Sequence, residues 1–357
     1  MITMNKNPNH IAELHLVRAF AIITVVSAHA WDPITGFFFY IPAVHIFFFL
    51  SGFFGVKYFK VKSGSIKRTI YHLLARLASV YLFCSFLAVA FKYPLNSFVS
   101  RPISLDTILA NIFLYPSRHP MIIIWFLYVL FLMNILTLVV NACFKINYRK
   151  ISHVCIGFSI LYLLHLGSFA TSFKIFGIDE LAQYSIFFFF GFICRLNYGV
   201  IYRWVFKYRY AILATTLIYL VYPSIRNVYI QFPFVVLNIF IAWSLAIIIL
   251  EKEFRIRLYL EKIADYAYGI YVYSYFPQAF IWIIRLQFNS VPDLVYCIAS
   301  TLAGLLFPII LIRYFFSNYY IFRKWAMGEW ERIYLPRALP LVPANWRSIR
   351  EIICILF

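Results

Sequence analysis

Long apolar stretches recur along the whole chain, and short polar segments separate them. A helix needs about 20 mainly apolar residues to cross a bilayer. Stretches of this kind are centred near residues 21, 48, 80, 132, 161, 188, 215, 241, 276 and 304. The connections between them are short, and neither a long linker nor an internal repeat interrupts the pattern. The sequence therefore predicts an all-α, polytopic membrane bundle of about ten transmembrane helices.

The composition supports this interpretation, since 64% of the residues are hydrophobic and only 13% are charged. A mean hydropathy of +0.82 lies far outside the range of soluble domains. The first apolar stretch lacks a signal-peptide cleavage site, so we expect it to be retained. The six cysteines are scattered without metal-ligand or CxxC spacing, and no metal site is expected. We expect one transmembrane domain over residues 1–317 and a basic, aromatic tail over residues 318–357.

Positive charge is unevenly distributed among the connections. The chain has 32 Lys and Arg residues against 13 Asp and Glu, a net charge of +19. With a cytoplasmic N-terminus, most of these cations fall in inner segments, namely 57–68, 145–150, 195–209, 252–262 and 323–350. The positive-inside rule then places both termini in the cytoplasm, with the tail on the inner leaflet. Loops that face anionic lipid account for the charge, so membrane lipids are expected partners and nucleic acid is not.

The first apolar stretch, residues 13–31, contains Arg18 near its cytoplasmic end and His29 near its outer end. On a helix, their separation corresponds to about 16 Å of rise and nearly three whole turns, so the two side chains share a face. Asp32 follows three residues later and can reach back to the imidazole. Charged groups within a span usually face a polar cavity or a partner, and the pair therefore predicts a functional path along this helix.

Structural interpretations of the same residues remain open. Arg18 can extend to the headgroups or pair with Glu13, and His29 can be an interfacial histidine beside Trp31. Asp32 can be a simple helix-end residue.

The second apolar stretch contains "HIFFFLSGFF", an aromatic run that meets Ser51 and Gly52. Glycine lets helices approach closely and serine can form hydrogen bonds between them, so a packing contact also fits this motif.

The arrangement R-x10-H in the first span, followed by FFFLSGFF in the second, resembles the integral-membrane acyltransferase-3 family. This family includes the O-acetyltransferases of bacterial surface polysaccharides. The likeness continues over nearly the whole chain with RLASVY (76–81), WFLYVLF (125–131), FFFFGFICR (187–195) and YAYGIYVYSYFPQ (266–278). The chain departs from the family at His15, where an acid is common, at His72, where paired arginines are common, and at Ser274, which replaces a histidine.

The resemblance implies acyl transfer from cytoplasmic acyl-CoA to an acceptor on the far side of the membrane. Arg18 would hold phosphate oxygens of coenzyme A in two parallel hydrogen bonds, with Arg76, Arg68 and His72 as further donor contacts. No permanently bound cofactor is expected, because acetyl-CoA is a substrate.

At the outer end, the resemblance implies His29 as the general base that accepts the proton of an acceptor hydroxyl. Asp32 would orient its ring, and Ser51 or the backbone near Gly52 would stabilise the oxyanion. A covalent acetyl-histidine route would use the same histidine as nucleophile.

Trp125 and Tyr271, within the matching motifs, are expected substrate contacts. The function implied is a membrane O-acyltransferase of the bacterial cytoplasmic (inner) membrane. Its acceptor would be a hydroxyl of a cell-surface or lipid-linked glycan, such as lipopolysaccharide O-antigen.

The alternative from another class is a transporter or flippase of a lipid-linked sugar. Most carboxylates lie at span ends or in loops, and so no buried acid is expected as the coupling site of such a carrier. A structural scaffold would not need Arg18 and His29 on one face.

Overall fold

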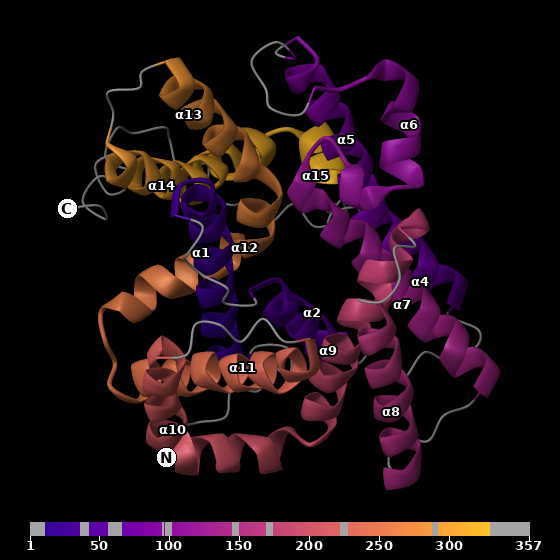
Figure 1. Ribbon diagram of the computed structural model, residues 1–357, viewed down its shortest axis with the longest axis vertical. Helices are drawn as coiled ribbons and strands as arrows, with labels where there is room; N and C mark the ends of the chain where they lie inside the picture. The colour runs from indigo at the N-terminus through magenta and orange to yellow at the C-terminus, as the bar shows by residue number, and fades with distance from the viewer. Residues whose placement is uncertain are drawn as a thin grey trace.

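The structure is a computed structural model, and it describes residues 11–35, 43–55, 66–94, 96, 102–144, 150–168, 174–221, 228–287 and 292–328. The regular elements of these residues are helical, which confirms the predicted all-α bundle (Figure 1). The α-helices are α1 (Ala12–Thr35), α2 (Ala43–Phe54), α4 (Ile66–Leu73), α5 (Ser79–Lys92), α6 (Leu105–Phe113), α7 (Trp125–Phe144), α8 (Ile151–Ser168), α9 (Ile178–Leu196), α10 (Tyr198–Val221), α11 (Val228–Glu251), α12 (Ile256–Tyr273), α13 (Tyr275–Gln287), α14 (Asp293–Leu311) and α15 (Tyr320–Met327). Short 3₁₀ turns cover Pro116–Arg118, Ile122–Ile124 and Ile175–Gly177, and π-helical turns cover Leu74–Ala78 and Ile312–Phe316.

Within the described residues, 7 helical segments are long and apolar enough to cross a membrane. They coincide with predicted spans and comprise Ala12–Trp31, Ile66–Lys92, Trp125–Cys143, Ile151–Ser168, Ile175–Leu196, Gln231–Glu251 and Asp293–Phe316. The three other predicted spans are also helical but differ in length or charge. Helix α2 has 12 residues, and α10 carries several cations in its first half. The stretch near residue 276 is divided at Ser274, because Pro277 has no N–H to donate to the carbonyl of Tyr273.

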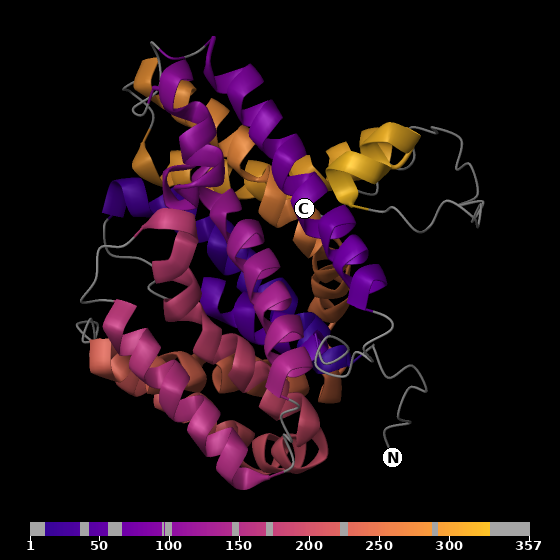
Figure 2. The same ribbon diagram turned by 90° about the vertical axis from the view of Figure 1, so that its right-hand side faces the viewer.

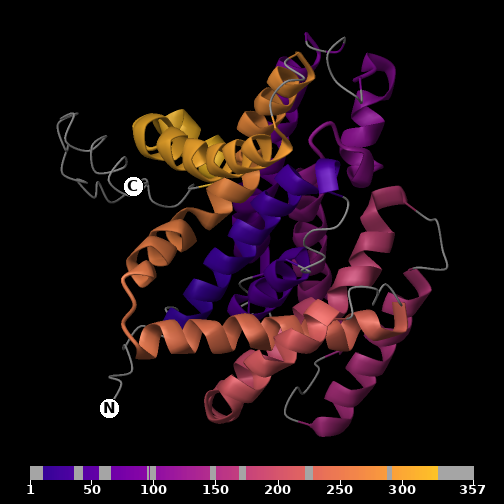
Figure 3. The ribbon, with the colours of Figure 1, turned by 60° about the vertical axis from the view of Figure 1, so that its left-hand side comes forward.

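Helix α1 lies in the middle of the bundle. Most of its side chains from Leu14 to Val26 are buried, and it packs against α2, α11, α12 and α14. Figure 3 shows this indigo helix between α11 and the orange and yellow C-terminal helices. The neighbouring helices therefore enclose most of the first half of α1, including Glu13.

Helices α2 and α9 pack at close range through two glycines. A Cβ on Gly52 would overlap the carbonyl oxygen of Phe188, and a Cβ on Gly191 would overlap that of Phe49. Only glycine fits at such a crossing. The packing interpretation of Gly52 is thus observed, and its contact with substrate stays a prediction.

The first part of the predicted tail forms α15, which lies beside α5 (Figures 1 and 2). The ring of Phe322 contacts those of Phe83 and Phe316, and the hydroxyl of Tyr273 donates a 2.6 Å hydrogen bond to the carbonyl of Ala326. Residues 320–327 are therefore packed against the bundle. The cytoplasmic placement of the termini stays a prediction.

Candidate active site

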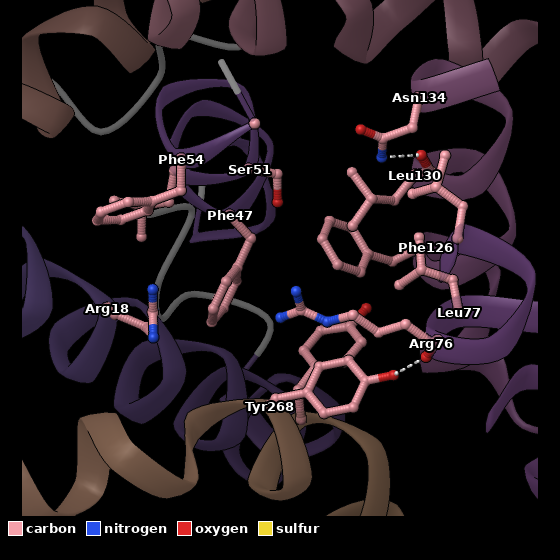
Figure 4. A pocket seen from close by; sticks show the side chains of 14 residues that line it. Arg18, Phe47, Ser51, Phe54, Arg76, Leu77, Phe126, Leu130, Asn134 and Tyr268 are labelled. Atoms are coloured by element: carbon pink, nitrogen blue, oxygen red, sulfur yellow. Dashed lines mark hydrogen bonds between the residues drawn. The ribbon is translucent and has the colours of Figure 1, made fainter. Parts of the chain in front are cut away.

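A cavity of about 640 Å³ lies between α1, α2, the π-helical turn after α4, α7 and α12 (Figure 4). Its walls are mainly aromatic and aliphatic, and a few polar side chains enter it. Four predicted site residues line it together: Arg18, Ser51, Arg76 and Tyr271. They come from different helices, so the cavity exists only in the folded bundle.

The two arginines enter the cavity from opposite sides, Arg18 from α1 and Arg76 from the π-helical turn (Figure 4). The guanidinium of Arg18 lies over the ring of Phe54, 5.3 Å from its centroid. Such a contact favours the cation without neutralising its charge. Arg18 also interacts unfavourably with the charge of Arg76 and favourably with that of Asp265. Two like charges at one cavity make it a favourable place for an anion.

The backbone of Arg76 is held by contacts from two distant segments. The π-helical turn Leu74–Ala78 brings Ser79 N–H to the carbonyl of Leu74, an arrangement that interrupts the regular α-helical bonding. The hydroxyl of Tyr268 donates to the carbonyl of Arg76 over 3.2 Å, and Gly328 packs against the same carbonyl. Helices α12 and α15 therefore fix where the Arg76 side chain begins.

Three rings form the apolar wall of the cavity. The ring centroids of Phe47 and Tyr271 are 5.7 Å apart, those of Phe126 and Tyr271 are 5.1 Å apart, and those of Phe47 and Phe126 are 6.1 Å apart. The hydroxyl of Tyr271 donates to the carbonyl of Ile123 at 2.6 Å. Because that donor is already used, Tyr271 presents its ring to the cavity.

Sequence reasoning missed Tyr268, Gly328 and Asn134 as residues of this site. Asn134 is buried within α7, and its Nδ2 donates to the carbonyl of Leu130 at 2.7 Å. An amide inside a long apolar helix is a signal that could have identified it, because polar groups at membrane depth are costly unless they have a role. Tyr268 and Gly328 are far from Arg76 in the sequence, so no local sequence pattern indicates that they contact it.

Three other predicted substrate contacts, Trp125, Arg68 and His72, are not among the residues that line the cavity. The rings of Trp125 and Tyr184 pack with centroids 5.3 Å apart. On α4, the Nε of exposed Arg68 lies 3.3 Å from the Nε2 of His72. The substrate contacts of Trp125, Arg68 and His72 stay predictions.

The predicted geometry of the first span is present, because α1 is one continuous helix from Ala12 to Thr35. Arg18 and His29 therefore share a face about 16 Å apart along its axis. His29 is exposed in the C-terminal part of α1, three residues after Val26, whose carbonyl accepts a 2.8 Å hydrogen bond from Nε2 of Gln278. Asp32 belongs to the last turn of α1, and its side chain lies outside the described residues. The catalytic roles of His29 and Asp32 stay predictions.

One expectation about the carboxylates is wrong. Glu13 is buried, because α1 begins inside the bundle, and its carboxylate accepts a hydrogen bond from the hydroxyl of Tyr198. A nearby acid, Asp265, lies 3.2 Å from Nε2 of His15. A transporter therefore cannot be argued against on the ground that the chain lacks a buried acid. Glu13 lies at the start of α1, however, and its carboxylate is already hydrogen-bonded to Tyr198.

Residues 11–313 match the family model described as an acyltransferase domain, acyltransferase-3. The chain belongs to the acyltransferase-3 family. The match contains every residue that lines the cavity. Comparison with curated proteins and with solved structures gives no match. Family membership and the long apolar helices make this protein a multi-pass membrane acyltransferase.

Proposed function

We propose that this acyltransferase moves an acetyl group from cytoplasmic acetyl-CoA to a hydroxyl of a cell-surface glycan, such as lipopolysaccharide O-antigen, in the bacterial inner membrane. The observation that carries the proposal is the convergence of Arg18 and Arg76 on one cavity. Charged side chains at membrane depth are costly, and two arginines at one cavity suit a donor that is itself an anion.

The chemistry of the cavity suits the donor. Coenzyme A has a phosphorylated head, and each guanidinium can hold a phosphate in two parallel charge-assisted hydrogen bonds. A volume of about 640 Å³ is within the usual range of sites for molecules of this class. The aromatic and aliphatic walls suit the pantetheine arm, which would extend from the arginines toward the outer half of α1.

In the proposed reaction, His29 accepts the proton of the acceptor hydroxyl while the hydroxyl oxygen attacks the thioester carbonyl. The new C–O bond forms, the C–S bond breaks, and coenzyme A leaves as a thiolate that takes up a proton. Asp32 would orient the imidazole. Ser51 would stabilise the oxyanion or, from its place beside the arginines, contact the donor. A covalent acetyl-histidine intermediate is the second route to the same products.

The acceptor is tested in whole cells with and without the protein. Mass spectrometry and NMR of isolated surface glycans should show acetyl signals that disappear when the protein is absent and return when it is supplied. Transfer of radiolabelled acetyl from acetyl-CoA into the same glycan by the purified protein completes the test. Glycans with unchanged acetylation would overturn the acceptor assignment.

The direction of transfer is tested separately by labelling single cysteines with an impermeant reagent added from outside. We expect residues introduced in 57–68 and 251–262 to be shielded and residues in 94–118 to be labelled. The reverse pattern would place the arginines on the wrong side for a cytoplasmic donor.

A further inference from the structure

The wall of the cavity contains one buried amide oxygen that is open to a ligand. Asn134 on α7 is only 4% exposed, and its Oδ1 has no hydrogen-bond partner among the described residues. Figure 4 shows this oxygen pointing into the cavity, away from Leu130. Buried polar atoms are normally hydrogen-bonded, so an open acceptor on the wall of a binding cavity indicates where a donor group binds.

The orientation of the amide is fixed by its own helix. Its Nδ2 donates to the carbonyl of Leu130 at 2.7 Å. A flipped amide would place two oxygens against each other, so Oδ1 must face the cavity. The group that completes the site therefore has an N–H or O–H to donate.

The position of Asn134 along α7 indicates what kind of ligand group donates the hydrogen bond to its Oδ1. Phe126, Leu130 and Asn134 follow one another at four-residue spacing and all line the cavity. They form a wall that is apolar for two turns and then offers one acceptor. The ligand beside it needs an apolar body with an isolated N–H, and the pantetheine arm of coenzyme A has this chemistry in its two secondary amides.

We propose that Asn134 binds the donor by accepting a hydrogen bond from an amide N–H of the pantetheine arm. This inference rests on the proposed function, because the arm enters the cavity only if the arginines hold the phosphorylated head. In this proposal, different residues bind the two ends of the acyl donor. Arg18 and Arg76 bind the phosphates of the head, and Asn134 binds an amide of the arm.

The test compares two probes without any acceptor present. Coenzyme A has the arm, whereas adenosine 3′,5′-bisphosphate has much of the head without it. Binding to the purified full-length protein is measured by calorimetry for wild type and Asn134→Leu, a change of similar size that removes the acceptor. The matched control is Asn238→Leu on α11, because Asn238 makes the same local bond, from Nδ2 to the carbonyl of Phe234 at 2.8 Å, and does not line the cavity.

Loss of one hydrogen bond should weaken coenzyme A binding about two- to tenfold in Asn134→Leu. Binding of adenosine 3′,5′-bisphosphate should stay at the wild-type level, which also shows that the variant is folded. Asn238→Leu should bind both probes normally.

Two results would overturn the inference while leaving the proposed function intact. One is unchanged coenzyme A binding in Asn134→Leu. The other is equal weakening of both probes, which would indicate a contact with the head or a change in the fold. Failure of the wild-type protein to bind either probe would overturn the proposed function and the inference together.

Discussion

Gly328 packs directly against the backbone of Arg76. Its φ is +66°, and a Cβ at this position would lie 2.6 Å from the carbonyl oxygen of Arg76 and 2.9 Å from its Cα. Gly328 directly follows α15, beyond the part of the chain that matches the family. The C-terminal region thus supports an arginine of the candidate active site.

Gly328→Ala should therefore move Arg76 and weaken coenzyme A binding, because backbone atoms must shift to admit the methyl group. The positive φ adds about 1–2 kcal/mol of strain. Gly177→Ala is the matched control, since Gly177 has a φ of +65° and its Cβ would meet the ring of Pro116 rather than Arg76. Calorimetry should show weaker binding only for Gly328→Ala. Equal affinity in the two variants would show that this contact does not position Arg76.

Arg18→Lys should lose about tenfold or more in coenzyme A affinity, because a point charge cannot form two parallel bonds to a phosphate. Arg76→Ala should lose at least as much, and the wild-type affinity should fall as salt concentration rises. Exposed Arg68 on α4 provides a comparison, and Arg68→Ala should have a smaller effect. If Lys at position 18 binds the donor as well as Arg does, the phosphate contact is wrong.

His29→Ala should abolish acetyl transfer while the protein still binds coenzyme A. The imidazole is exposed in the C-terminal part of α1, about 16 Å along the helix from Arg18, so its removal should leave the fold and the arginines of the cavity in place. Transfer is followed with radiolabelled acetyl-CoA, and binding is followed by thermal shift. Substantial transfer by this variant would remove His29 from the mechanism. If His29→Ala lost both transfer and coenzyme A binding, the proposal that Arg18 binds the donor while His29 acts only as the base would be contradicted.

Gly52→Ala should destabilise the fold rather than alter donor binding alone. The methyl group would overlap the carbonyl of Phe188 at the crossing of α2 and α9, and overpacking of this kind costs about 1–3 kcal/mol or more. Gly167→Ala is the control, since among the described residues nothing outside its own turn of α8 lies within 4 Å of a Cβ at that position. Thermal unfolding in detergent should show a lower midpoint for Gly52→Ala only. A normal midpoint would mean that the helices can separate without loss of stability.

His119 is buried and lies in the connection between two membrane-spanning segments, Ile66–Lys92 and Trp125–Cys143. Nδ1 accepts from the N–H of Met121 at 3.0 Å in the neutral ring and can donate to the carbonyl of Met121 at 3.1 Å in the protonated ring. Nε2 lies 2.8 Å from Oγ of Ser85. Ser85 in turn donates to the carbonyl of Tyr81 at 2.7 Å. Burial lowers the pKa of His119 to about 4, a hydrogen bond from the protonated ring to the carbonyl of Met121 opposes this shift, and the charge of Lys92 adds to it.

This network should make the protein less stable in acid. Between pH 6.5 and about 4, the unfolded chain binds a proton at His119 that the folded chain does not. The free energy of unfolding therefore falls as pH falls through that window, by up to about 3 kcal/mol. His119→Gln should flatten the pH dependence of the unfolding midpoint, because it removes the group that takes up this proton. An unaltered pH profile in His119→Gln would contradict the assignment.

The sequence alone determined the helical architecture and much of its segmentation. A chain in lipid must satisfy its backbone polar groups within each segment, so apolar length by itself predicts a spanning helix. Helical periodicity is also local, so the sequence predicted that Arg18 and His29 share one face of the continuous helix α1. The motifs quoted from the spans also identified the family correctly.

Only the tertiary structure decided which side chains share a cavity. Arg76 meets Arg18 because separate helices pack around α1, and Asn134 joins them from a third helix. The contact of Gly328 with Arg76 connects residues far apart in the chain. Local periodicity describes the face of one helix but not the neighbour that covers it, and that choice depends on the packing of the whole bundle. For the same reason, the sequence left Gly52 open between packing and binding, and the close crossing of α2 and α9 revealed the packing role.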